Sequence, residues 1–236
     1  MMLPELRRLL DAVPARAGRG DYRSAVVDGN VLDKPTTRAR KLTFEHLCDL
    51  YALDPNVCLY RVFRQLWAAD PESRPILALT LALARDMLLR VSAPVVLDAR
   101  PGEQVTRGRM EDEYRALGKG RFSDTSIEAI AQRVNGTWTQ AGYLSGKVTK
   151  IRSVPVITSA NLCFALFFAY LDGRLAQRLF TSDWARVLDL SADRLMELAR
   201  VASDRNLLVL RRTGEVVEIR FPGLLTDQEQ EWLNEQ

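Results

Sequence analysis

Two helices followed by an extended segment form a pattern that occurs twice in this sequence, and it constrains the fold more than any other feature. The first copy consists of helices predicted at 106–117 and 124–139, followed by an extended segment at 147–157 that is rich in Val and Ile. Apolar residues of the second helix recur at helical spacing and share one face. They are Ile127, Ile130, Ala131, Val134 and Trp138.

The second copy lies at the C-terminal end of the chain. Helices are predicted at 183–188 and 192–204, and strands at 207–212 and 215–221. The strands are joined by a Thr-Gly pair, and a tight turn with Gly between β-branched runs is a hairpin signal. Helix, turn, helix and a small β-wing is the order of a winged helix-turn-helix. Because such units also serve as protein-interaction modules, the fold alone does not decide the function.

The first hundred residues read as helices separated by short loops that contain Pro, Gly or Asp. One helix ends near Pro14, one begins near Thr37, one ends near Trp67, and a long core helix runs to about Val91. The sequence "DARPGE" at 98–103 then interrupts the chain. We therefore predict a mainly α protein in three parts. They are a helical N-terminal domain at 1–100, a winged-helix-like unit at 101–157, and C-terminal helices with a β-hairpin wing at 158–236.

A basic first turn marks the helix predicted from Thr37. It holds Arg38, Arg40 and Lys41, although cations at a helix N-terminus are disfavoured by ~0.3–1 kcal/mol each. An anion from outside the chain would explain Arg38 and Lys41, with Lys34 just before the helix as a further contact. Arg40 falls close to the core face of the helix, so we expect a structural ion pair there.

A second basic stretch lies between Glu128 and Asp172, where no acidic residue occurs. Acid-poor basic segments attract polyanions, although a solvated basic face is the alternative. Arg, Asn and Gln on a recognition helix read base edges, and hydroxyls at its start can donate to phosphate. The residues predicted to bind DNA, from both stretches, are Lys34, Arg38, Lys41, Thr125, Gln132, Arg133, Asn135, Lys147, Lys150 and Arg152.

The start of the helix at 124–139 has two readings. Ser123 can act as its N-cap. Thr125 with Glu128 offers an alternative capping box.

The sequence gives little support to catalysis. His46 is the single histidine and has no paired nucleophile nearby, and the three cysteines have no metal-site spacing. No glycine-rich phosphate loop occurs either. We therefore expect a protein that is not an enzyme, with no cofactor, no metal and no small-molecule substrate.

Cysteine count and apolar run length bear on the compartment. An odd number of cysteines without a disulfide framework is typical of a reducing compartment. The most apolar runs, 76–84 and 161–171, are shorter than the ~20 residues that a membrane span needs. Both runs predict buried core helices, and we expect a cytoplasmic protein without a membrane partner.

Four segments resemble one family. "NVLDKPTTRARK" at 30–41 and "WTQAGYLSGKVTKIR" at 138–152 are similar to the BrxA family of bacteriophage-exclusion (BREX) systems, as are 66–90 and 214–225. The resemblance implies a small, mostly helical protein whose N-terminal domain compares with the antiterminator NusB. It also implies DNA binding beside a methyltransferase and ATPases that exclude phage. It implies no active-site residues.

These observations together predict an accessory protein of phage defence. It would bind double-stranded DNA through its basic helix and wing surfaces and act with other defence proteins. Two alternatives stay open, a protein scaffold whose basic patches meet acidic protein surfaces and an RNA-binding module. Salt dependence separates DNA binding from the scaffold, because phosphate-driven binding weakens log-linearly with salt.

Overall fold

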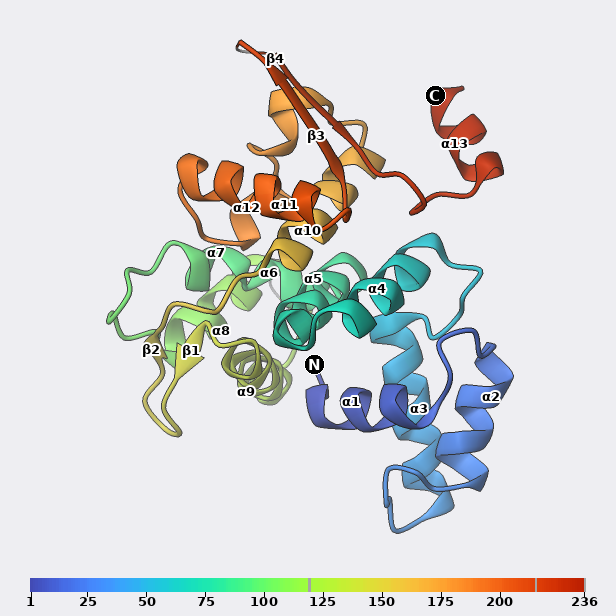
Figure 1. Ribbon diagram of the computed structural model, residues 1–236. Helices are drawn as coiled ribbons and strands as arrows, with labels where there is room; N and C mark the ends of the chain where they lie inside the picture. The colour runs from blue at the N-terminus through green and yellow to red at the C-terminus, as the bar shows by residue number, and fades with distance from the viewer. Residues whose placement is uncertain (119, 215, 236) are drawn as a thin grey trace. The chain divides into compact units, whose positions relative to one another are not determined.

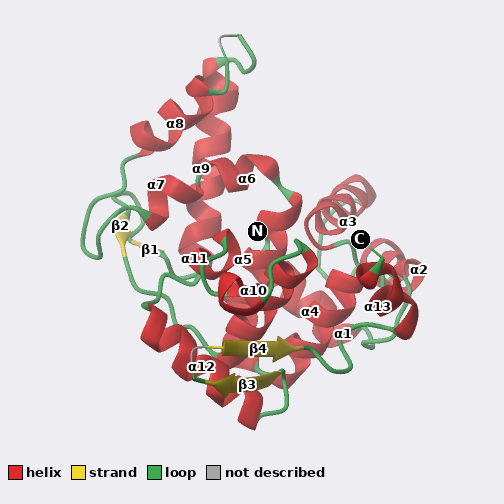
Figure 2. Cartoon of the chain, turned by 90° about the horizontal axis from the view of Figure 1, so that it is seen from above, coloured by secondary structure: helices red, strands yellow, loops and turns green. Residues whose placement is uncertain are grey.

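The computed structural model describes residues 1–118, 120–214 and 216–235 of the chain. It is mainly α-helical with two small two-stranded antiparallel hairpins, which confirms the predicted fold class at this level (Figures 1 and 2). The chain divides into two compact units. The first contains Met1–Tyr60 and Ala78–Val156, and the second contains Arg61–Leu77 and Ile157–Gln236. The helices α4 (Cys58–Ala69) and α5 (Arg74–Arg85) contribute residues to both.

The first unit begins with short helices packed around a longer one. They are α1 (Leu3–Ala12), α2 (Arg19–Arg23), the π-helical turn η1 (Ser24–Asp28) and α3 (Thr37–Tyr51). The predicted apolar face of α3 is buried, and Thr36 caps this helix by accepting a hydrogen bond from the Ala39 amide at 3.1 Å. The prediction of a helix beginning near Thr37 is thus confirmed.

The long core helix predicted to reach Val91 is interrupted. It consists of α5, which ends at Arg85, and the separate helix α6 (Met87–Val91), followed by α7 (Ala93–Leu97). Asp86 adopts an extended conformation between them, and its carboxylate accepts hydrogen bonds from the Leu88 and Leu89 amides. Asp is a favourable N-cap residue, so Asp86 starts the new helix α6. The apolar sequence therefore spans two helices that are separated by one extended residue.

The remainder of the first unit is α8 (Arg107–Ala116), α9 (Asp124–Gln140) and a hairpin of β1 (Leu144–Ser145) and β2 (Ile151–Arg152). The predicted apolar face of α9 is buried. The Trp138 indole is buried completely and donates to Ser92 Oγ at 2.8 Å. Of the two readings of the α9 start, the structure has the Ser123 cap, which accepts from the Ser126 amide.

The hairpin is shorter than the extended segment predicted at 147–157, since only Ile151–Arg152 forms a strand there. On its other side β2 is hydrogen-bonded to residues 102–105. The Gly102 amide donates to the Arg152 carbonyl at 2.8 Å, and the Val105 amide donates to the Lys150 carbonyl at 2.9 Å. The segment 102–105 therefore fixes the hairpin to the unit.

Gly146 makes the tight turn at the hairpin tip possible. Its φ is +89°, and a Cβ built there would lie 2.1 Å from the Thr149 carbonyl oxygen. We expect Gly146→Ala to lower the free energy of unfolding by more than about 1 kcal/mol. Gly136→Ala is the control, because a Cβ there meets nothing within 4 Å. Removing a helix-interior Gly should stabilise by about 0.5–1 kcal/mol. Urea unfolding measures both, and equal stabilities would contradict the turn geometry.

The second unit is built around α10 (Ser159–Leu171), which is buried along most of its length and confirms the predicted core helix. Asn161 Nδ2 donates to the Ser73 carbonyl at 2.8 Å. The other elements are the 3-10 turns η2 (Pro71–Ser73) and η3 (Ala176–Leu179), the helices α11 (Asp183–Val187), α12 (Ala192–Asp204) and α13 (Asp227–Asn234), and the strands β3 (Val209–Thr213) and β4 (Val216–Arg220).

The β3–β4 hairpin has the alternation that the sequence predicts. Val217, Ile219 and Phe221 are buried, and Phe221 packs against Phe167 with ring centroids 5.4 Å apart. The described part of the chain contains no helix long and apolar enough to cross a membrane.

Candidate nucleic-acid interface

The first turn of α3 presents two free cations. Arg38 and Lys41 are exposed, and neither forms an ion pair with any residue that the structure describes. The first turn holds no acidic residue. Two positive charges therefore lie without internal compensation at a helix end that is itself partly positive.

Arg40 differs from its neighbours, as predicted, but its contacts are hydrogen bonds to carbonyls. Nε donates to the Lys34 carbonyl and Nη1 to the Val27 carbonyl, both at 3.3 Å. The side chain is half-buried and holds the loop that precedes α3. Arg40 therefore stabilises the fold beneath the two exposed cations.

Lys34 is compensated inside the protein. Its Nζ lies 3.0 Å from Glu5 Oε1, and both side chains are 27% exposed. Burial works to raise the pKa of the Glu5 carboxyl, but the hydrogen bond and charge of Lys34, together with a backbone hydrogen bond and the charge of the N-terminal amine, outweigh it, so the pKa lies below its usual value. Lys34 thus links α1 to the loop before α3. Because Glu5 neutralises its charge, Lys34 attracts a phosphate less strongly than an unpaired lysine would.

The Glu5–Lys34 pair predicts a pH dependence of stability. A carboxyl whose pKa is lowered by folding contributes stability above its unfolded pKa and loses it as the pH falls through the folded pKa. We expect Lys34→Met to be less stable than wild type at pH 7. The difference should shrink as the pH falls below about 4, where an unperturbed Glu titrates. Urea unfolding from pH 7 to pH 3 measures it, and a constant difference would contradict this role.

Only some of the α9 residues that the sequence predicts to bind DNA are exposed. Gln132 and Arg133 are exposed, whereas Asn135 is only 6% exposed. Thr125 is exposed but lies between Asp124 and Glu128 at the acidic start of α9. Arg107 pairs with Glu128 at 3.0 Å and Arg115 lies 3.9 Å from Asp124, so the charges around Thr125 compensate one another and do not add to the predicted phosphate contact.

The sequence analysis places Arg152 among the cations that contact DNA, which requires an exposed side chain. The structure contradicts this, because Arg152 is buried. The side chain is 2% exposed, and Nε donates to the Val96 carbonyl at 2.8 Å. The guanidinium also donates to the Ser153 carbonyl and lies 5.1 Å from the Tyr143 ring centre. The reason is the strand register, which pairs Arg152 with the buried Leu144.

The hairpin tip carries the other two predicted cations. Lys147 is exposed and forms no ion pair with a described residue, and Lys150 Nζ donates to the Gly146 carbonyl at 2.7 Å. Val148 between them is 91% exposed. An apolar side chain flanked by cations therefore projects from this tip.

A groove of about 540 Å³ separates this tip from α9 and the segment 104–107. It brings together Gln132, Asn135, Lys147 and Lys150 of the predicted residues. The sequence analysis did not single out Gly136 and Val148, which also line it. A Gly inside a helix was the available signal, because Gly is unfavourable there unless space is needed.

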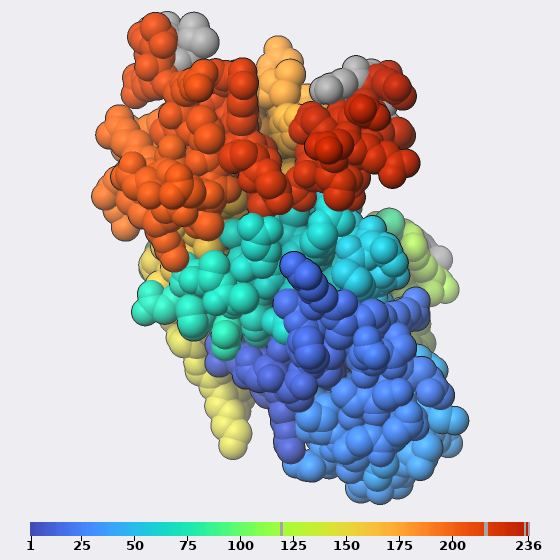
Figure 3. Space-filling view, turned by 45° about the vertical axis from the view of Figure 1, so that its right-hand side comes forward, coloured from blue at the N-terminus to red at the C-terminus, as the bar shows by residue number. Residues whose placement is uncertain are grey.

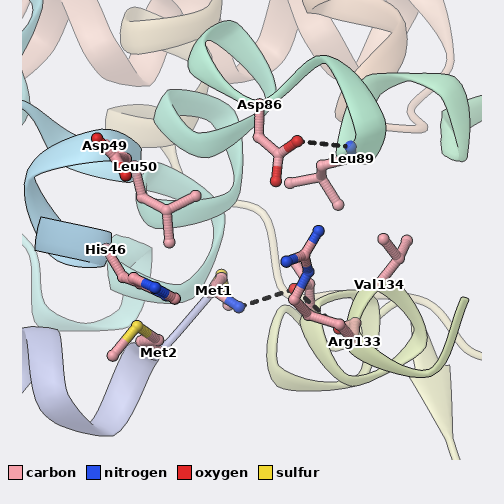
Figure 4. A pocket seen from close by; sticks show the side chains of 10 residues that line it. Met1, Met2, His46, Asp49, Leu50, Asp86, Leu89, Arg133 and Val134 are labelled. Atoms are coloured by element: carbon pink, nitrogen blue, oxygen red, sulfur yellow. Dashed lines mark hydrogen bonds between the residues drawn. The ribbon is translucent and has the colours of Figure 1, made fainter. Parts of the chain in front are cut away.

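Arg133 faces a different pocket, of about 360 Å³ (Figure 4). Figure 4 shows its side chain extending toward Asp86, with His46 on the opposite wall. Burial, and then the charge of Arg133, lowers the pKa of the Met1 amine to about 6. His46 belongs to no cluster of three or more described residues that could hold a metal ion.

The two cationic regions project from the same unit. Figure 3 shows the hairpin tip in yellow and the lobe of α2 and α3 in blue as separate projections, with N-terminal residues in darker blue between them. Gln132 adds an exposed amide on the hairpin side.

No protein-family model, curated protein or solved structure matches this chain. What its surface can do follows from the side chains present. Exposed cations that lack a carboxylate partner favour phosphate groups, and amide side chains pair with base edges.

Proposed function

We propose that this chain is a non-enzymatic DNA-binding accessory protein of a bacterial phage-defence system of the BREX type. The observation that carries DNA binding is that Arg38, Lys41 and Lys147 are exposed at two projecting sites and have no ion-pair partner among the described residues. Cations that neutralise phosphates release counterions, which supplies most of nonspecific DNA affinity. The first turn of α3 and the hairpin tip would hold the duplex backbone from two sides.

A winged-helix reading supports the same function. In each unit, two consecutive helices precede an antiparallel hairpin, α8 and α9 before β1–β2, and α11 and α12 before β3–β4. We take α9 as the recognition helix of the first, with Gln132 and Arg133 exposed. The burial of Asn135 leaves fewer groups for reading bases, which favours binding with little sequence preference.

The role in phage defence rests on the resemblance to the BrxA family. Its most specific pieces are 30–41 and 138–152, which contain the α3 cations and the hairpin. Other defence proteins are the expected partners, in a cytoplasmic setting. A comparison of the helical N-terminal part with NusB belongs to the same resemblance.

A protein scaffold is the second candidate function. Exposed apolar side chains are candidates for contact with another protein where several of them form a patch. On this chain they include Met87, Val154, Val156, Leu175 and Trp232. Binding to an acidic protein surface would also use the free cations, so the test must separate phosphate from carboxylate partners.

A gel shift over a salt series tests DNA binding. We expect a Kd of ~10⁻⁴–10⁻⁶ M for duplex DNA at physiological salt, with little sequence preference. If three or four phosphates are neutralised, log K should fall with log salt at a slope of about −3 to −4. Duplex RNA of equal length separates DNA from RNA binding. If neither duplex is shifted at low salt, the DNA proposal fails and the scaffold is favoured.

A further inference from the structure

Asn135 is buried at the groove beneath the hairpin tip with an unused hydrogen-bonding atom. Its side chain is 6% exposed, and Oδ1 accepts no hydrogen bond from any described residue. A buried polar atom without a partner destabilises a fold, and such atoms in native structures call for an explanation. Oδ1 has almost no accessible surface, but Asn135 lines the groove, so a rotation of its amide toward the groove would let a donor on a ligand supply the missing partner.

The other residues that line the groove offer charged and apolar contacts to a ligand, in addition to the hydrogen bond with Asn135. Lys147 and Lys150 are the cations on its hairpin wall, and Val148 offers an apolar surface between them. Gly136 leaves open space on the α9 side, because a Cβ there would meet nothing within 4 Å. Arg107 also lines the groove, but Glu111 and Glu128 already neutralise it.

An amide, an apolar surface and two cations together match one nucleotide. The amide pairs with a base edge that offers a donor beside an acceptor, the apolar surface contacts the face of the base, and the cations attract phosphate. Adenine presents an amino group beside a ring nitrogen, the pairing that Asn prefers in DNA. The volume of about 540 Å³ lies within the roughly 300–1,000 Å³ typical of small-molecule sites.

The burial of Asn135 decides between a stacked and an unstacked base. A base edge inside an intact duplex is held in the stack and is met by side chains that project from a helix surface. Asn135 is recessed instead, so a base must leave the stack to reach it, as unpaired bases do at low cost. A single strand or a duplex with an unpaired base therefore fits the groove.

We propose that this groove binds an unstacked adenine of a DNA strand. Asn135 pairs with the amino edge of the base, and Lys147 and Lys150 hold the adjoining phosphates. The proposal rests on the proposed DNA-binding function and adds a base site to it.

Fluorescence anisotropy with labelled oligonucleotides of equal length tests the proposal. The set contains an oligo-dA strand, the same strand with abasic positions, and a blunt duplex. We expect the wild type to bind oligo-dA about tenfold more tightly than the abasic strand, since one bidentate pair supplies that much discrimination. Equal binding of these two strands would overturn the base site while leaving duplex binding, and with it the proposed function, intact. If none of the three binds, the proposed function fails as well.

Two variants separate a base contact from a structural role. Asn135→Leu keeps the side-chain shape, removes the unused oxygen, and should melt at or above the wild-type temperature while losing the tenfold preference. Gly136→Leu places a side chain in the space beside α9, keeps the Asn135 amide, and should also lose the tenfold preference. Both should bind the blunt duplex with an unchanged salt slope. If Gly136→Leu, folded as judged by its melting curve, keeps the preference for oligo-dA, the base does not occupy this groove.

Discussion

Arg152→Ala is expected to lower the free energy of unfolding by about 3–5 kcal/mol. The guanidinium is buried and donates to the carbonyls of Val96 and Ser153. Hydrogen bonds from a charged donor are worth ~1.5–3 kcal/mol each, and the truncated side chain would leave buried acceptors without partners. Loss of the contact with the Tyr143 ring adds to this cost.

Lys147→Ala is the matched control, because Lys147 lies on the same hairpin and is exposed. Exposed substitutions of this kind change stability by less than about 0.5 kcal/mol. Arg152→Lys should also destabilise, since an ammonium group cannot reproduce the fork of a guanidinium. Urea unfolding of the three variants measures the differences. Equal stability of Arg152→Ala and Lys147→Ala would show that Arg152 does not anchor the hairpin.

The features that the sequence predicts well are those fixed by near neighbours in the chain. The helices predicted at 183–188 and 192–204 begin where expected, because Ser182 caps α11 and Ser191 caps α12, and each accepts a hydrogen bond from an amide three residues ahead. The apolar faces of α3 and α9 follow from a spacing that a helix imposes on any sequence. Such local rules also locate the exposed cations of the first turn of α3.

The features that the sequence does not predict depend on distant partners or on competition between local rules. Arg152 is held by Val96, which is 56 positions away, and Lys34 is neutralised by Glu5, which is 29 positions away. Neither partner is visible from the sequence around the cation. Asp86 caps a helix within an apolar run, where a continuous helix was the simpler reading.

In the candidate DNA-binding surface, too, some features follow from the local sequence and others depend on the tertiary structure. Exposure of Arg38, Lys41 and Lys147 agrees with a reading from charge alone. The recessed position of Asn135 does not follow from that reading, because a helical wheel cannot show a hairpin loop folded over one side of α9. DNA contact by these residues stays a prediction.

Arg38→Glu with Lys41→Gln is expected to weaken duplex binding about a hundredfold at 50 mM salt while leaving the protein as stable as wild type or slightly more stable. Loss of two phosphate contacts reduces the slope of log K against log salt by about 1.8, which at that salt corresponds to this loss of affinity. In the free protein the two cations oppose the α3 dipole without an ion-pair partner among the described residues. A carboxylate at position 38 is instead favourable by ~0.3–1 kcal/mol.

Gln is the better replacement at position 41, because a Glu there would lie four positions before Glu45 and repel it. The control is Arg174→Glu with Arg178→Gln, which changes the net charge equally at two exposed positions of the second unit that precede α11. It should keep most of the affinity. If the control loses as much, DNA binding follows net charge and not the first turn of α3.

Arg40→Glu completes the comparison, because Arg40 lies between the two exposed cations in sequence but is bonded to the carbonyls of Lys34 and Val27. We expect this variant to melt at a lower temperature, since a carboxylate cannot donate to either carbonyl and would be half-buried beside them. Thermal melting and duplex titration in one low-salt buffer cover all three variants. A clear loss of stability in the Arg38/Lys41 variant would mean that these cations hold the fold, and an external phosphate would no longer be needed to explain them.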